Sequence, residues 1–303
     1  MSATDRPKPV NSGGRSRYLP ILYILLQSTL YGFADPISKA AYKILSVYSV
    51  LFVRYSLALA FLLLFFGRRI KQGLYECSWK DWIGPALCIG GANDCGNVAL
   101  KLTSATSAAF LRSLSTVMTP LLVFVLFRTK LKKRHFPILL LVVAGLYLLC
   151  GPGGLSKFGW GEILSLLSAL FIAGSLVLGE RSLKRVDSVT LTVVQVAASA
   201  ISTLTFALFL EHGAHLKAAS TTHWAIIVFL ALGCTVPGYL LQNAALRRIS
   251  SRTVALIRCS GPVMTAVFSW LILNERMSPL SMTGAAILLA CVVIETLMAD
   301  KGS

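Results

Sequence analysis

Acidic residues are scarce in this chain, and the residues that usually carry enzyme chemistry form no recognisable set. The sequence holds 12 Asp and Glu against 29 Lys and Arg, with four histidines. Its seven cysteines show no CxxC spacing, and no metal-ligand pattern, nucleophile–base pair or glycine-rich phosphate loop occurs. We therefore expect neither an enzyme nor a bound cofactor or metal, and an intramembrane hydrolase is disfavoured.

Most of the sequence consists of long apolar stretches. Hydrophobic residues make up 55% of the 303 residues and mean hydropathy is +0.73, which is rare for a soluble domain. Stretches near the roughly 20 residues that cross a bilayer recur along the whole chain. They cover residues 19–41, 47–66, 82–102, 105–127, 136–150, 160–180, 189–210, 224–246, 254–273 and 280–298. The first is interpreted as a retained helix because nine more follow it. The sequence predicts an all-α membrane protein with ten transmembrane helices.

The net charge of +17 is unevenly distributed between the loops. With the N-terminus in the cytoplasm, 20 of the 29 Lys and Arg fall in inner segments, 6 in outer segments and three within apolar stretches. This asymmetry follows the positive-inside rule and predicts that both termini are cytoplasmic. A nucleic-acid partner is then unnecessary, and the lipid bilayer is the expected surrounding. The absence of an N-x-Ser/Thr sequon favours a bacterial inner membrane.

An internal repeat divides the chain into two halves. A shift of 146 residues places Arg112 on Arg258, Asn97 on Asn243, and the sequence Val-Met-Thr at 117–119 on the same three residues at 263–265. Residues 18–151 and 159–299 then form two repeats of five helices each. An odd number of helices inverts the second copy in the membrane, an architecture common among secondary transporters.

Several segments resemble the EamA family of the drug/metabolite transporter superfamily. They are YGFADPISKAAYK, GEILSLLSALFIAGSLVLGERSLKR and GYLLQNAALRRISSRTVALIRCSGPVMTAVFSWLILNERMS, and the resemblance covers nearly all of residues 18–299. The family's proline in the fourth helix is missing, and Thr116 stands there. The resemblance implies a ten-helix exporter of small metabolites or drugs. It also implies a central cavity lined mostly by helices one, three, four, six, eight and nine.

Two arginines stand at matching places inside the apolar stretches. Pro262 follows Arg258 by four residues, so it leaves the carbonyl of Arg258 without a helical donor and bends the helix there. Two interpretations of Arg258 stay open. Its side chain either extends to the cytoplasmic surface or presents a fixed charge to a cavity, where it binds a carboxylate or phosphate. Our hypothesis is the second, with Arg112 as the counterpart.

Polar residues also recur on one face of several helices. They either form hydrogen bonds between helices or line a cavity, and their correspondence between the repeats favours the cavity. The predicted substrate-binding residues are Arg258, Arg112, Asn93, Asn97, Tyr239, Gln242, Asn243 and Thr265.

Four charged residues have the same expected depth, roughly 9–12 Å below the outer surface at a rise of about 1.5 Å per residue. They are Asp35, Arg54, Asp94 and Arg112. Charges in a bilayer core normally face a partner or a wet cavity. The four residues form either an ion-pair network that holds helices together or an outer gate. Asp35 and Asp94 are the predicted residues for proton coupling or gating.

These features predict a secondary transporter that works by alternating access. The expected activity is export of a small metabolite with an anionic group, such as an amino acid or organic acid, driven by a proton or substrate gradient. The alternatives are a membrane receptor or scaffold that transports nothing, and an exporter of cationic drugs.

Overall fold

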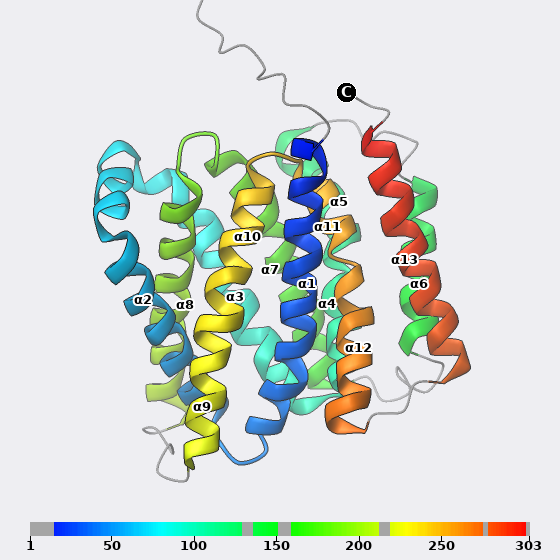
Figure 1. Ribbon diagram of the computed structural model, residues 1–303, viewed down its shortest axis with the longest axis horizontal. Helices are drawn as coiled ribbons and strands as arrows, with labels where there is room; N and C mark the ends of the chain where they lie inside the picture. Colours follow the sequence, from blue (N-terminus) through cyan, green and yellow to red (C-terminus); the bar gives the residue numbers. More distant parts are fainter. Residues whose placement is uncertain (1–14, 129–135, 151–158, 212–218, 275–277, 301–303) are drawn as a thin grey trace, which may run out of the picture.

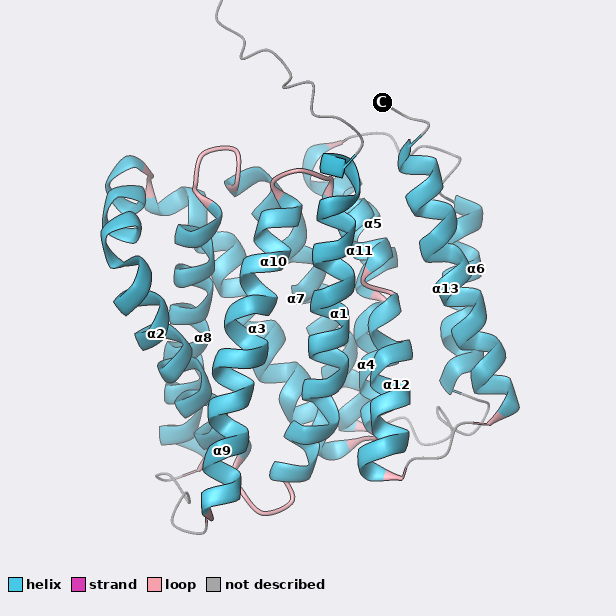
Figure 2. Cartoon of the chain, viewed as in Figure 1, coloured by secondary structure: helices cyan, strands magenta, loops and turns pink. Residues whose placement is uncertain are grey.

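The computed structural model describes residues 15–128, 136–150, 159–211, 219–274 and 278–300. Every regular element in these ranges is a helix, and the described chain contains no strand (Figure 2). The helices stand side by side, and α1 begins at the end of the bundle where α13 ends, the upper end in Figure 1. The prediction of an all-α protein is confirmed for this part of the chain.

The helices of the first half are α1 (Arg15–Ala41), α2 (Val47–Glu76), α3 (Trp79–Leu102), α4 (Ala105–Ser113), α5 (Ser115–Phe127) and α6 (Phe136–Cys150). Those of the second half are α7 (Trp160–Ser182), α8 (Ser188–Leu210), α9 (Thr221–Phe229), α10 (Val236–Leu246), α11 (Ser251–Ile257), α12 (Ser260–Leu273) and α13 (Pro279–Asp300). A π-helical segment, Leu230–Thr235, joins α9 to α10.

Length and composition identify the chain as a membrane protein. Six described helical stretches of 23 to 30 residues are apolar enough to cross a bilayer. They are Val47–Glu76, Ala105–Phe127, Trp160–Ser182, Ser188–Leu210, Thr221–Leu246 and Ser251–Leu273. Large apolar side chains remain exposed along these helices, for example Leu64 at 79% and Phe209 at 74%, as expected where lipid covers the protein.

The second helix is longer than its apolar stretch predicted. The sequence predicts an end near residue 66, whereas α2 continues to Glu76. Its extra turns are polar and carry Arg69, which pairs with Asp187 at the start of α8. Packing of α2 against α8 therefore supports a helical extension that hydropathy alone does not report.

Two of the predicted spans are broken near their middle, at corresponding positions of the two predicted repeats. The first break separates α4 from α5 at Leu114, and the second separates α11 from α12 at Arg258 and Cys259. The carbonyl of Arg258 is not left free, as the sequence analysis expected, because it accepts the amide of Gly261 at 2.8 Å. The first break forms without the family's proline.

The two broken helices contact each other at their breaks. The hydroxyl of Thr116 in α5 donates to the carbonyl of Ala255 in α11 at 2.8 Å, and its oxygen lies 3.0 Å from the sulfur of Cys259. Thr116, which stands where the resembled family has a proline, thus joins the first half of the chain to the second. This contact between the broken helices lies beside the break at Leu114, where the sequence has no proline.

Two glycines allow α1 to lie very close to its neighbours. A Cβ placed at Gly32 would lie 2.5 Å from the Cβ of Met264 in α12, and one at Gly238 in α10 would lie 2.6 Å from the ring of Tyr31. Close approach of this kind is typical of glycine at helix interfaces in membranes. It seats α1 against α10 and α12, beside the polar cavity described next.

Candidate functional site

A cavity of about 130 Å³ lies among the helices, and most of the side chains that line it are polar. Its walls come from α1, α2, α3, α7 and α10, together with the two broken helices α4–α5 and α11–α12. The breaks bring short helical segments with polar ends to the wall, where backbone groups can face a cavity instead of lipid. The family resemblance did not imply a contribution from α2, which supplies Arg54 and Tyr55.

Most of the predicted site residues line this cavity. The set comprises Arg112, Arg258, Asn93, Asn97, Tyr239, Gln242 and Thr265, together with Asp35. Two predicted residues, Asn243 and Asp94, are absent from its lining. Each of these two follows a lining residue directly in the sequence.

Asn243 is fully buried and forms a contact between helices. Its amide nitrogen in α10 donates to the hydroxyl of Thr192 at 2.9 Å and to the amide oxygen of Gln195 at 2.8 Å, both in α8. These bonds match the alternative interpretation, in which the polar face holds helices together. Its repeat partner Asn97 does line the cavity, so the two positions are not equivalent.

Asp94 lies on the face of α3 that packs against α8. Ser202 of α8 lies within hydrogen-bonding range of its carboxyl group, whose Oδ1 is buried without a partner. A Cβ at Gly90, one turn earlier, would also meet Ser202 and Ala198 of α8. The sequence analysis placed Asp94 with Asp35 and the two arginines, and the structure separates it from them.

Asp35 and Arg112 are brought together as an ion pair in the cavity wall. Nη2 of Arg112 donates to Oδ2 of Asp35, and Nε of Arg112 donates to the carbonyl of Ala108 at 3.3 Å. The pair joins α1 to α4. Of the four charged residues predicted at one depth, these two are the ones that form a pair.

Arg258 is held inside the cavity by a neutral side chain. Its Nη1 donates to Oε1 of Gln242 at 2.8 Å, and the same oxygen accepts from Nε2 of Gln27 at 2.8 Å. Among the residues that the structure describes, no carboxylate pairs with this guanidinium. The side chain lines the cavity in this conformation instead of extending to the upper end of the bundle.

Arg54 is a cavity residue that the sequence analysis did not assign to the binding site. It is 7% exposed, its Nε donates to the hydroxyl of Thr235 at 2.7 Å, and its Cζ lies 5.9 Å from the centroid of the Tyr55 ring. Thr235 belongs to the π-helical segment, an element frequent at functional sites. An arginine inside an apolar stretch was a visible signal, but its partner was expected to be an acid.

A chain of hydrogen bonds fixes the amide side chains of α3. The hydroxyl of Tyr42 donates to Oδ1 of Asn97 at 2.8 Å, and Nδ2 of Asn97 donates to the carbonyl of Asn93 at 2.8 Å. Nδ2 of Asn93 donates in turn to the hydroxyl of Tyr239 at 2.7 Å. The chain connects α3 to α10 across the cavity wall and orients the polar groups that face a ligand.

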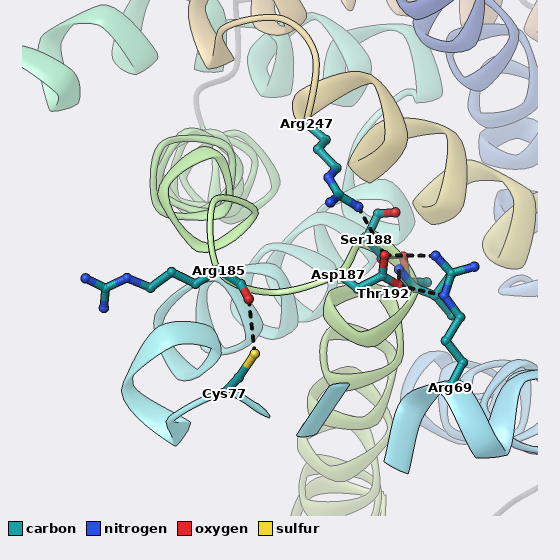
Figure 3. A network of polar contacts seen from close by, with 8 residues as sticks. Arg69, Cys77, Arg185, Asp187, Ser188, Thr192 and Arg247 are labelled. Atoms are coloured by element: carbon teal, nitrogen blue, oxygen red, sulfur yellow. Dashed lines mark hydrogen bonds and ion pairs between the residues drawn. The ribbon is translucent and has the colours of Figure 1, made fainter. Parts of the chain in front are cut away.

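A second polar cluster lies outside the cavity, at the upper end of the bundle (Figure 3). Asp187 accepts from the amide of Val189 at the start of α8, from Arg69 at the end of α2, and from Arg247 just after α10. Partial burial opposes the charged form, but the bonds from Arg69 and Val189 and the charges of Arg69 and Arg247 hold the pKa of Asp187 below its ordinary value. This carboxylate therefore ties three helices together.

Long apolar helices around a polar cavity define an integral, multi-pass membrane protein. The model of the EamA-like transporter family matches residues 18–151 and 159–296, and the chain belongs to this family. The resemblance noted in the sequence is thus confirmed. The family's name indicates a transporter rather than an enzyme.

Several known proteins are similar over most of their length. A protein of Archaeoglobus fulgidus named an uncharacterized transporter is 27% identical over 94% of this chain and 88% of its own. The riboflavin transporter ImpX of Fusobacterium nucleatum is 24% identical over 90% of this chain and 95% of its own. A crystal structure with a TM-score of 0.75 covers 95% of this chain and 98% of its own at 18% identity, which shows a shared fold alone.

Proposed function

We propose that the protein is a secondary transporter that exports a small metabolite with an anionic group by alternating access. Ten membrane spans in two inverted repeats, at 18–151 and 159–299, would supply two related gates around one cavity. The two matches of the family model and the paired breaks in the fourth and ninth spans support this arrangement. Similarity to a riboflavin transporter supports a small organic substrate.

The proposal rests on an arginine in the cavity wall that pairs with no described carboxylate. Arg258 contacts Gln242, a neutral residue, although a charge inside a membrane protein normally has an opposite charge nearby. The planar guanidinium suits the two oxygens of a carboxylate. A substrate anion would complete this site, and a cation would be repelled from it.

Asp35 is the carboxylate best placed for proton coupling. It lines the cavity and pairs with Arg112, so a substrate anion that bonds to Arg112 would displace Asp35 from its partner. Substrate exchange on Arg112 would thereby be linked to uptake and release of a proton by Asp35.

The orientation we propose is that of both termini in the cytoplasm of a bacterial inner membrane. Described arginines at the upper end of the bundle, where α1 begins, include Arg69, Arg185 and Arg247. The positive-inside rule assigns this end to the cytoplasm. The upper end would then be the side from which the substrate enters.

Reconstituted vesicles test the proposal directly. Purified protein should move labelled amino or organic acids across the bilayer. Affinity should fall in the order Arg258, Arg258→Lys, Arg258→Gln, because lysine keeps the charge and loses the bidentate geometry. The glutamine variant should lose about 1.5–3 kcal/mol of binding free energy, the contribution of a hydrogen bond to a charged group.

The matched control is Arg248→Gln, which removes a charge from an exposed position just after α10. Equal affinity of the parent and the Arg258→Gln variant would refute the role of Arg258 and the anionic substrate with it. Binding without transport would indicate a receptor, and efflux of cations in place of anions would indicate a drug exporter.

A further inference from the structure

The cavity carries an excess of positive charge that the protein itself does not neutralise. Three guanidiniums line it, from Arg54, Arg112 and Arg258, against one carboxylate from Asp35. At neutral pH these four side chains sum to two positive charges. Uncompensated charge in a membrane interior is costly, and it marks a pathway for a charged ligand.

The three arginines differ in how far their bonding capacity is used. Arg112 is occupied by Asp35 and by the carbonyl of Ala108. Arg54 donates through Nε to Thr235, and Arg258 donates through Nη1 to Gln242. The other nitrogens of Arg54 and Arg258 bond to no described residue, so each guanidinium is held at one point by a neutral oxygen with further donors free.

The two guanidiniums with free donors line the same cavity and come from different helices. Arg54 comes from the third turn of α2, and Arg258 from the break between α11 and α12. Tyr31, whose ring packs on Gly238 of α10, lines the same cavity. Since both side chains line one cavity, a ligand that fills it can meet both arginines, with a separate anionic group for each.

We propose that the substrate is a small organic dianion, with one anionic group on Arg258 and the second on Arg54. The proposal rests on the proposed function and sharpens it from one anionic group to two. In this conformation, a dianion on these two arginines cancels the two unbalanced charges of the cavity. A monoanion leaves one buried guanidinium without a counter-charge.

The test compares dicarboxylates with their own monoamides on purified full-length protein. The series runs from malonate to pimelate, since chain length reports the separation of the two guanidiniums. Binding is measured by calorimetry and by ligand-induced thermal stabilisation, which rises with ligand concentration relative to Kd. At the best length, the dicarboxylate should bind roughly ten- to a hundredfold more tightly than its monoamide, the effect of one charge-assisted bond.

Two variants assign the two groups. In Arg54→Gln and in Arg258→Gln, the dicarboxylate should bind no more tightly than the monoamide, because one carboxylate has lost its partner. Arg248→Gln, the exposed control, should retain the full difference. Each variant is first checked for a monodisperse elution profile and a parental melting temperature. If Arg54→Gln fails this check, Arg54→Lys, which keeps the charge, takes its place.

The outcomes separate this proposal from the one on which it rests. If monoamides bind as tightly as dicarboxylates and depend on Arg258, the dianion proposal fails and the anionic substrate stands. Dicarboxylate binding that is unaffected by Arg54→Gln overturns the assignment of the second group. If no member of the series binds but a monocarboxylic acid does, in a way that depends on Arg258, the dianion proposal also fails.

Discussion

Replacement of Asp187 tests how the upper end of the bundle is held together. The carboxylate caps α8 through the amide of Val189 at 3.1 Å, and loss of such a cap costs about 0.5–2 kcal/mol. It also pairs with Arg69 at 2.9 Å and Arg247 at 3.1 Å. The arginine side chains are 58% and 54% exposed, so each pair should contribute only about 0.2–1 kcal/mol.

Two substitutions at Asp187 separate these contributions. Asp187→Ala removes the cap and both ion pairs, and we expect a loss of about 1–4 kcal/mol in the free energy of unfolding. Asp187→Asn keeps a good capping residue and removes the charge, so the expected loss is about 0.4–2 kcal/mol. Thermal unfolding of purified protein in one detergent measures both.

Salt and pH identify the charge component. The difference between the parent and Asp187→Asn should shrink as salt screens the exposed pairs. The pKa of Asp187 is lowered in the folded protein, so its stabilisation is complete above the unfolded value of about 3.9 and is lost as pH falls through the folded pKa. If Asp187→Asn matches the parent at low salt and neutral pH, the ion pairs stabilise nothing and the reasoning is refuted.

Three further predictions concern coupling, packing and topology. In vesicle assays, Asp35→Asn should abolish transport driven by a pH gradient and keep substrate exchange at equal pH, whereas Asp94→Asn, outside the cavity, should keep both. Full coupling in the Asp35 variant would contradict this prediction. Gly238→Ala should lower stability by about 1–3 kcal/mol, because its methyl would meet a tyrosine ring of α1 at 2.6 Å; an unchanged melting temperature would argue against this contact. In a cysteine-free background, a cysteine placed at position 132 should be protected from impermeant thiol reagents added outside, and one placed at position 215 should react. The reverse pattern would mean that the proposed topology is inverted.

Hydropathy and local backbone chemistry made several features predictable. Long apolar stretches exclude a soluble fold because such side chains must be covered by lipid or by one another. The missing amide of Pro262 indicated the interruption beside Arg258, because a proline cannot donate to the carbonyl four residues earlier. The break at Leu114 had no such local signal, and it lies beside a contact that only the fold creates, between Thr116 and Ala255.

The sequence by itself determined the class of the protein, its family and the presence of arginines inside its spans, because composition, period and motif order are properties of the chain. Only the tertiary structure decided which polar neighbours share the cavity. Asn93 lines it and Asp94 does not, and Gln242 lines it and Asn243 does not. One residue along a helix turns the side chain by about 100°, and helices that are apolar on most faces carry no pattern that distinguishes lipid, neighbour and cavity. The partners of Arg54 and Arg258, a threonine and a glutamine from other helical segments, were likewise set by packing.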